Sequence, residues 1–273
     1  MEIEKMYLDL LAKALIDYHR TGRIEYQPFV WRKLTWSQKP LLPLERMLRT
    51  RDYSICKMVK SDIVKRKVGE DWPYYADSMI GLKRLENIRD CVIDVIKNKI
   101  EGDLIETGVW RGGATIFMRG ILKAYSVTDK TVWAADSFEG LPKPDDKYIH
   151  DKNDTHHQID LLKVSLEDVK NNFLKYDLLD DQVKFLKGWF KDTLPNAPIK
   201  KLSLLRLDGD MYESTMDGLV NLYPKLSQGG YIIIDDWGII EACRKAVEDY
   251  RLANSITDEI IPIDRWSVYW KKT

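Results

Sequence analysis

Two apolar segments that each end in a pair of aspartates restrict the fold of this chain more than any other feature. Residues 202–207 and 231–234 have the composition of buried strands, and carboxylates follow both at once: Asp208 and Asp210 after the first, Asp235 and Asp236 after the second. In an extended chain, side chains two residues apart point the same way, so Asp208 and Asp210 can face one spot. Neighbouring strands of this kind would bring four acids together at one edge of a sheet.

A group of four carboxylates needs a counter-charge if it is removed from water. The desolvation of each charged group costs several kcal/mol, and the acids also repel one another. A hard cation with oxygen ligands removes this repulsion. The alternative is that the aspartates cap helices or sit in solvated turns after the strands, since Asp is a favoured N-cap residue. The sequence therefore predicts either a metal site or a set of caps at this edge.

A glycine-rich turn lies earlier in the chain. Residues 103–113 (Asp-Leu-Ile-Glu-Thr-Gly-Val-Trp-Arg-Gly-Gly) predict a short strand that runs into a tight turn, before a helix and a second strand that ends at Asp136. This order is typical of proteins that bind the ribose hydroxyls of a nucleoside. The spacing Gly-x-x-x-Gly-Gly is not the dinucleotide fingerprint, which weakens a dehydrogenase interpretation. Glu106 beside the turn would repel phosphate and attract a cation, unless it is only a solvated strand end.

The remainder of the C-terminal two-thirds alternates between strand and helix patterns. Five strand–helix units and a terminal hairpin, formed by residues 259–263 and 267–270, predict an α/β fold with a mostly parallel sheet and helices on both faces. Ligands of such sheets bind at the carboxyl ends of the strands. The following residues are expected there: Glu106, Asp136, Trp189, Asp208 and Asp235.

The N-terminal region has a different character. Residues 3–18 carry apolar side chains at three- and four-residue steps and predict an amphipathic helix. Residues 22–43 contain Trp36 among basic side chains and are expected to form a loop docked on the body. We divide the chain into a helical N-terminal cap and lid, residues 1–80, and an α/β domain, residues 81–273. Residues 71–80 either form a lid over a ligand or cover the core.

A polar segment at residues 142–158 contains three of the four histidines of the chain, together with several aspartates. We expect a flexible, solvated surface loop. The alternative is that its histidines and aspartates ligate a metal ion or supply a base.

The composition bears on partners and on the cellular compartment. Lys and Arg total 43 and Asp and Glu total 43, whereas a general nucleic-acid binder needs an excess of positive charge. The three cysteines, Cys56, Cys91 and Cys243, are scattered and suit a reducing cytosol. There is neither an apolar run of membrane-spanning length nor the charge order of a signal peptide. We expect a cytoplasmic protein that binds neither nucleic acid nor membrane.

Five segments in this order resemble the macrocin O-methyltransferase (TylF-like) family. They are residues 103–113, 136–142 (Asp-Ser-Phe-Glu-Gly-Leu-Pro), 188–195 (Gly-Trp-Phe-Lys-Asp-Thr-Leu-Pro), 207–215 (Leu-Asp-Gly-Asp-Met-Tyr-Glu-Ser-Thr) and 235–236 (Asp-Asp). The resemblance implies a metal-dependent enzyme that uses S-adenosylmethionine to methylate sugar hydroxyls of natural products. It also implies a Rossmann-like class I methyltransferase fold, in which a seven-stranded, mostly parallel sheet has its last strand antiparallel.

The resemblance also assigns roles to individual residues. Mg²⁺ would be held by Asp208, Asp235 and Asp236, and Asp210 would be the general base; the alternative is a histidine, as in some relatives. The residues implied in binding S-adenosylmethionine are Ser78, Met79, Glu106, Thr107, Gly108, Arg111, Gly112, Asp136, Ser137, Gly188 and Trp189. The expected partners are a sugar-bearing small molecule and further copies of the chain, with the N-terminal helix as a candidate contact.

The residues alone leave two other functions open. The same acids could serve a carboxylate–metal hydrolase or phosphoryl-transfer enzyme, although no Walker-type phosphate cradle is present. A non-catalytic nucleoside-binding module is the second alternative. The sequence does not identify the acceptor.

Overall fold

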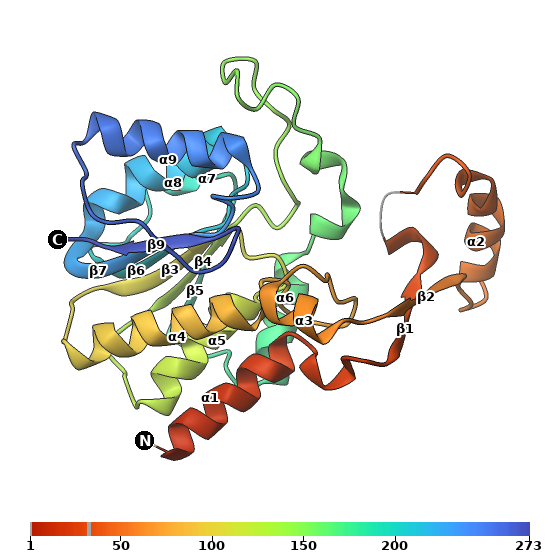
Figure 1. Cartoon of the computed structure of the whole chain (residues 1–273), viewed down its shortest axis with the longest axis horizontal. Helices are drawn as coiled ribbons and strands as arrows, with labels where there is room; N and C mark the ends of the chain where they lie inside the picture. Colours follow the sequence, from red (N-terminus) through yellow and green to blue (C-terminus); the bar gives the residue numbers. More distant parts are fainter. Residues whose placement is uncertain (1, 32–33) are drawn as a thin grey trace.

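A seven-stranded sheet forms the centre of the computed structural model, which describes residues 2–31 and 34–273. The strands follow the order β5-β4-β3-β6-β7-β9-β8 (Figure 1). All neighbours from β5 to β7 are parallel, whereas β9 runs antiparallel to both β7 and β8. The bounds are β3 Asp103–Thr107, β4 Val132–Asp136, β5 Val183–Lys187, β6 Leu202–Leu207, β7 Leu226–Ile234, β8 Ile261–Pro262 and β9 Val268–Lys271. The predicted fold class and the antiparallel last strand are confirmed.

The register of the central strands places their ends side by side. Thr107 of β3 pairs with Leu207 of β6, which pairs with Ile234 of β7. The residues that follow these three therefore leave the sheet at the same edge. Every residue of β6 is buried, because helices cover both faces of a parallel sheet. This packing explains the nearly continuous apolar run in the sequence.

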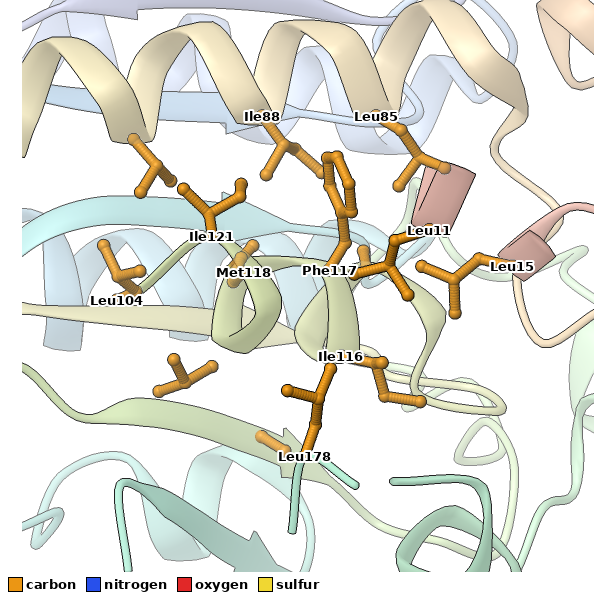
Figure 2. Close-up of a cluster of buried hydrophobic side chains, with 14 of the residues drawn as sticks. Leu11, Leu15, Leu85, Ile88, Leu104, Ile116, Phe117, Met118, Ile121 and Leu178 are labelled. Carbon is orange, nitrogen blue, oxygen red and sulfur yellow. The ribbon is translucent and has the colours of Figure 1, made fainter. Parts of the chain in front are cut away.

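Helices cover the two faces of the sheet as separate layers (Figure 1). On one face, α1 (Glu2–Leu15), α4 (Gly81–Lys97), α5 (Gly113–Ala124) and α6 (Leu166–Lys175) share one apolar cluster. Figure 2 shows its centre, where Leu11 and Leu15 of α1 and Leu85 and Ile88 of α4 meet Phe117 of α5. On the other face, α8 (Tyr212–Leu222) and α9 (Glu241–Ala253) pack on the sheet, with the short α7 (Phe190–Thr193) beside α8.

The N-terminal region has a packed part and a projecting part. Leu8, Leu11 and Leu15 of α1 are buried in the same cluster as α4 and α5, so this helix shares the core of the α/β layer. In contrast, the hairpin of β1 (Ile24–Pro28) and β2 (Cys56–Lys60), with α2 (Leu42–Arg49), projects from the body (Figure 1). The short α3 (Ile63–Val68) then returns the chain to α4. The division at residue 80 stays a prediction.

The structure corrects several details of the predicted elements. Trp36 is 88% exposed, so the expectation of a docked loop is wrong for this side chain; Arg32 and Lys33 lie outside the described residues. Helix α6 begins at Leu166, where Ser165 caps it by accepting from Asp168 N. The predicted terminal hairpin is confirmed as β8 and β9. Within the described residues, every helix is too short or too polar to cross a bilayer.

Candidate functional site

A cavity of about 310 Å³ opens at the carboxyl ends of the strands. Its lining includes backbone turns after β3, β4, β5, β6 and β7, together with the segment that precedes α4. Twelve of the residues predicted for the site lie on its wall: Ser78, Met79, Glu106, Gly108, Asp136, Ser137, Gly188, Trp189, Asp208, Asp210, Asp235 and Asp236. The structure therefore brings together the two aspartate pairs and the glycine turn.

Thr107, Arg111 and Gly112 are not part of the cavity wall. Thr107 is buried within β3, because the parallel neighbours β4 and β6 flank it. Gly112 faces the core, where an added Cβ would meet Val169 at 3.0 Å. The predicted direct contact of these residues with a cofactor therefore lacks support from the structure.

Arg111 instead fastens the segment that precedes α4. Its Nη1 donates to the carbonyl oxygens of Tyr74 at 2.6 Å and Ala76 at 2.8 Å. On the same segment, Ser78 packs so closely on Gly113 that an added Cβ at the glycine would lie 2.4 Å from the Cβ of Ser78. This segment is thus held against the glycine turn, and Trp72 and residues 77–80 form one wall of the cavity.

Asp208, Asp235 and Asp236 form a triad of acids. One carboxylate oxygen of each lies within 4.8 Å of the others, so a single cation can contact all three. Asp236 is 8% exposed, and its Oδ2 is buried without a hydrogen-bond partner. Burial, and then the charges of Asp210, Asp208 and Asp235, raise the pKa of Asp236 well above its usual range. Without a cation, this environment therefore disfavours the ionised form of Asp236.

Two buried arginines lie behind the triad and were not anticipated from the sequence. Arg206 of β6 donates to Glu106 at 2.6 Å and to Asp208 at 2.8 Å, and it also pairs with Asp235. Arg84 of α4 donates to the other oxygen of Asp235 at 2.6 Å and to Asp264 at 2.8 Å. Burial acts to raise the pKa of Asp235, but the two guanidinium groups outweigh it and lower that pKa.

Asp210 has a strained backbone and faces the same cavity. Its φ of 57° lies in the left-handed region, which is uncommon for residues other than glycine and is frequent at functional sites. Burial and then the charge of Asp208 raise the pKa of Asp210 to about 7. A carboxylate with this pKa is suited to take a proton near neutral pH.

The cradle for a nucleoside is built from backbone groups around β3 and β4. Asp136 accepts from Val109 N and Phe138 N, both at 2.7 Å, which fixes its carboxylate at the strand end. An added Cβ at Gly108 would lie 1.8 Å from the carbonyl oxygen of Asp208, so only glycine fits between β3 and β6. Glu106 lies at the base, where Arg206 and Thr115 bond to its two oxygens. Burial raises the pKa of Glu106 to about 7 despite Arg206.

The segment at residues 142–158 is mostly exposed, as predicted, but it is anchored to the body at one buried residue, Asp151. Asp151 is 1% exposed and accepts from Tyr212 N at 2.7 Å and Glu213 N at 2.9 Å. It therefore satisfies free N–H groups of the first turn of α8, the helix that follows Asp210. His156 lies on the cavity wall, and its Nδ1 lies 2.6 Å from Asp154 Oδ2. Burial acts to lower the pKa of His156, but Asp154 and Asp210 outweigh it and raise that pKa.

We expect Asp151→Ala to lower the free energy of unfolding by about 1–3 kcal/mol, because two N–H groups of α8 lose a charged acceptor. Urea denaturation of the whole chain measures the change. Asp146→Ala is the matched control, since Asp146 is an exposed residue of the same segment and should change little. Equal stabilities of the two variants would show that Asp151 does not anchor the segment.

Known proteins resemble this chain closely in sequence. The model of the macrocin-O-methyltransferase (TylF) family matches residues 4–272. Demethyldecarbamoylnovobiocin O-methyltransferase of Streptomyces niveus is 59% identical over 210 residues, which are 76% of this chain and 80% of the relative. Mycinamicin III 3''-O-methyltransferase of Micromonospora griseorubida is 54% identical over 212 residues, 76% of this chain and 83% of the relative.

Solved structures share the fold. The O-methyltransferase NovP superposes with a TM-score of 0.83 at 48% identity, and the match covers 99% of both chains. The calicheamicin methyltransferase CalS11 superposes with a TM-score of 0.57 at 16% identity over 88% of this chain and 94% of that one. At that identity the second comparison supports the shared fold alone.

Proposed function

Because the chain belongs to the macrocin-O-methyltransferase (TylF) family, we propose that it methylates a hydroxyl of a sugar-bearing small molecule, with Mg²⁺ as an essential ion. S-adenosylmethionine is the methyl donor. The observation that carries the proposal is the convergence, in one cavity, of the acid triad, the Asp210 carboxylate and the nucleoside cradle. Family membership disfavours the hydrolase, the nucleoside-binding module and the dehydrogenase that the residues alone had left open.

The donor set fits magnesium. Asp208, Asp235 and Asp236 offer carboxylate oxygens, which a hard divalent cation prefers. The buried Oδ2 of Asp236 has no hydrogen-bond partner, so it is available to ligate such an ion. A bound Mg²⁺ would polarise the acceptor hydroxyl and so make its proton easier to remove. Arg84 and Arg206 would keep Asp235 in place beside it.

The cofactor would lie across the strand ends of the cradle. Asp136 would accept hydrogen bonds from the ribose hydroxyls, with Ser137 alongside, and Gly188 and Trp189 would border the adenine. Gly108 and Glu106 would face the methionine end, with Ser78 and Met79 as the lid. Arg111 would act through this lid, since it bonds to the backbone of residues 74 and 76.

Asp210 would take the proton of the acceptor hydroxyl as the oxygen attacks the methyl group. General bases of this kind contribute roughly 10²- to 10⁴-fold to a rate. The cavity walls would hold the acceptor oxygen, the methyl carbon and the sulfur in line, and such alignment can supply about 7–11 kcal/mol of the barrier reduction. His156, paired with Asp154, is the second candidate for the base.

The acceptor class rests on the names of the relatives. A third relative, from Streptomyces olivaceus, is 52% identical over 214 residues, and its name describes methylation at the 4' oxygen of a dimethoxy-rhamnosyl tetracenomycin. We propose a deoxysugar attached to a natural product as the acceptor here. A methyl-transfer screen with labelled S-adenosylmethionine over free and aglycone-linked sugars, with and without Mg²⁺, tests this proposal. The absence of transfer to every sugar-bearing acceptor would contradict it.

We expect Asp208→Asn to abolish metal-dependent turnover and to leave S-adenosylmethionine binding largely intact. The substitution removes a charged ligand from the triad but no group from the adenine and ribose cradle. Methyl-transfer assays and calorimetric titration with S-adenosylhomocysteine measure the two effects separately. Equal activity of the unaltered protein with Mg²⁺ and with EDTA would contradict the metal requirement.

We also propose that the chain forms a homo-oligomer in the cytoplasm. The outer face of α1 exposes three large apolar side chains in a row: Ile3 at 81%, Met6 at 66% and Leu10 at 59%. Contiguous exposed apolar side chains of this kind are typical of protein–protein contacts. The three cysteines are free thiols, which suits a reducing compartment. Sedimentation of the whole chain tests the assembly, and a monomer at micromolar concentration would contradict it.

A further inference from the structure

One buried guanidinium contacts acids that belong to both halves of the cavity. Arg206 is 0% exposed; its Nη1 donates to Glu106 Oε1 at 2.6 Å and to Asp208 Oδ2 at 2.8 Å, and its Nη2 donates to Asp235. Glu106 lies at the end of β3 on the cofactor side, whereas Asp208 and Asp235 belong to the acid triad. Arg84 also bonds to Asp235, but its second carboxylate partner is Asp264.

The rigid shape of the guanidinium links the positions of its three carboxylate partners. Its donors are fixed in one plane, and the group keeps its charge in proteins, so it moves as a rigid fork. Any displacement that follows Asp208 or Asp235 therefore changes the hydrogen bond to Glu106 as well. Glu106 has little freedom of its own, because Thr115 bonds to its other oxygen and the carboxylate is 2% exposed.

We propose that Arg206 is a positioning residue that couples magnesium binding to cofactor binding; this inference rests on the proposed function. Binding at the triad fixes the positions of Asp208 and Asp235, and the rigid guanidinium passes this constraint to Glu106. A cofactor that binds afterwards meets a Glu106 that is already held in place, which produces positive cooperativity without a change of fold. Reciprocity requires that the cofactor tighten magnesium binding by the same factor.

The coupling is measured on the full chain by calorimetry, without catalysis. The dissociation constant of Mg²⁺ is determined with and without saturating S-adenosylhomocysteine, and that of S-adenosylhomocysteine with and without Mg²⁺. We expect each ligand to lower the dissociation constant of the other by the same factor, roughly 5- to 150-fold, which is the usual range for coupled sites.

Three variants assign the coupling to the shared guanidinium. Arg206→Lys keeps the charge but loses the fork, and should reduce the factor to less than about twofold. Arg84→Lys is the matched control, because Arg84 holds the same Asp235 without touching Glu106. It should weaken magnesium binding and leave the factor unchanged. Glu106→Gln removes the charge at the cofactor end only, so magnesium and S-adenosylhomocysteine should then bind independently of each other. This variant tests the coupling if Arg206→Lys does not fold.

The outcomes separate the inference from the function on which it rests. An unchanged factor in a folded Arg206→Lys overturns the inference, and so does an unchanged factor in Glu106→Gln. An equal loss in Arg84→Lys also overturns it, because the coupling would then depend on Asp235 rather than on the shared group. If both ligands bind the unaltered chain independently, only the inference fails. If either ligand does not bind at all, the proposed function fails with it.

Discussion

Asp210→Asn is expected to lower kcat by roughly 10²- to 10⁴-fold and to change the affinities for S-adenosylhomocysteine and Mg²⁺ little. Asparagine has the shape of aspartate but takes no proton at neutral pH. It also tolerates the left-handed backbone that Asp210 adopts at φ 57°, so the turn should survive the change. Single-turnover methyl transfer, in which binding and chemistry are resolved, measures the loss.

Asp177→Asn is the matched control for Asp210→Asn. Asp177 has a nearly equal φ of 53°, is exposed and lies after α6, away from the cavity. It should retain full activity. A folded Asp210→Asn variant with unaltered kcat would exclude Asp210 as the base; a large loss in His156→Ala would then favour the histidine paired with Asp154.

The edge of the sheet was predictable because it depends on local and periodic features. An apolar run predicts a buried strand, and residues that follow parallel strands meet at one edge. Leu207 pairs with Thr107 and with Ile234, which confirms this expectation and brings Asp208 beside Asp235. The glycine turn was predictable as well, because the sequence marks it with three glycines. The structure gives the reason for one of them: an added Cβ at Gly108 would lie 1.8 Å from the backbone of Asp208.

The partners of the acids were not predictable from spacing. Arg206 stands within the apolar run of β6, and a charged residue in a fully buried strand was itself a signal that a carboxylate partner lies nearby. Asp208, two residues along the same segment, was within reach of such reasoning, but Glu106 of β3 and Asp235 after β7 are 100 and 29 positions away. Arg84 reaches Asp235 across 151 positions of sequence, and no local pattern identifies such a pair.

The anchor of the segment at residues 142–158 was missed for the same reason. Its composition is typical of a solvated loop, and composition says nothing of a tertiary anchor. Asp151 meets the N-terminus of α8 across 61 positions, and this contact buries it. It also satisfies N–H groups of the first turn of α8, which begins at Tyr212.

Asp236→Asn is expected to stabilise the metal-free protein by about 1–3 kcal/mol while abolishing the response to magnesium. The Oδ2 of Asp236 is buried without a partner, and burial and the charges of Asp210 and Asp208 raise its pKa, so folding must either bury a repelled charge or take up a proton. An asparagine avoids this cost. An asparagine amide can instead donate to one of these neighbours. Mg²⁺ at 100 times its dissociation constant should stabilise the unaltered chain by about 2.7 kcal/mol, and the variant by nearly nothing.

The order of stability should therefore reverse with the metal. In EDTA the Asp236→Asn variant should resist urea better than the unaltered chain, and in saturating Mg²⁺ the unaltered chain should resist better. Asp235→Asn is the informative contrast, since it changes the adjacent residue by the same atoms. Its carboxylate pairs with Arg84 and Arg206, and loss of one partner of a buried ion pair costs about 3–5 kcal/mol. It should destabilise the protein even in EDTA.

Neighbouring aspartates with opposite effects would distinguish a cluster built for a cation from a merely structural network. In a structural network each carboxylate has a protein partner, so that both substitutions would destabilise the metal-free fold. In a cation site at least one carboxylate lacks such a partner until the ion arrives, which is the condition of Asp236 and not of Asp235. If both variants lose stability in EDTA, the Oδ2 of Asp236 is not a ligand that awaits a metal ion. The assignment of a magnesium site to the triad would then be wrong.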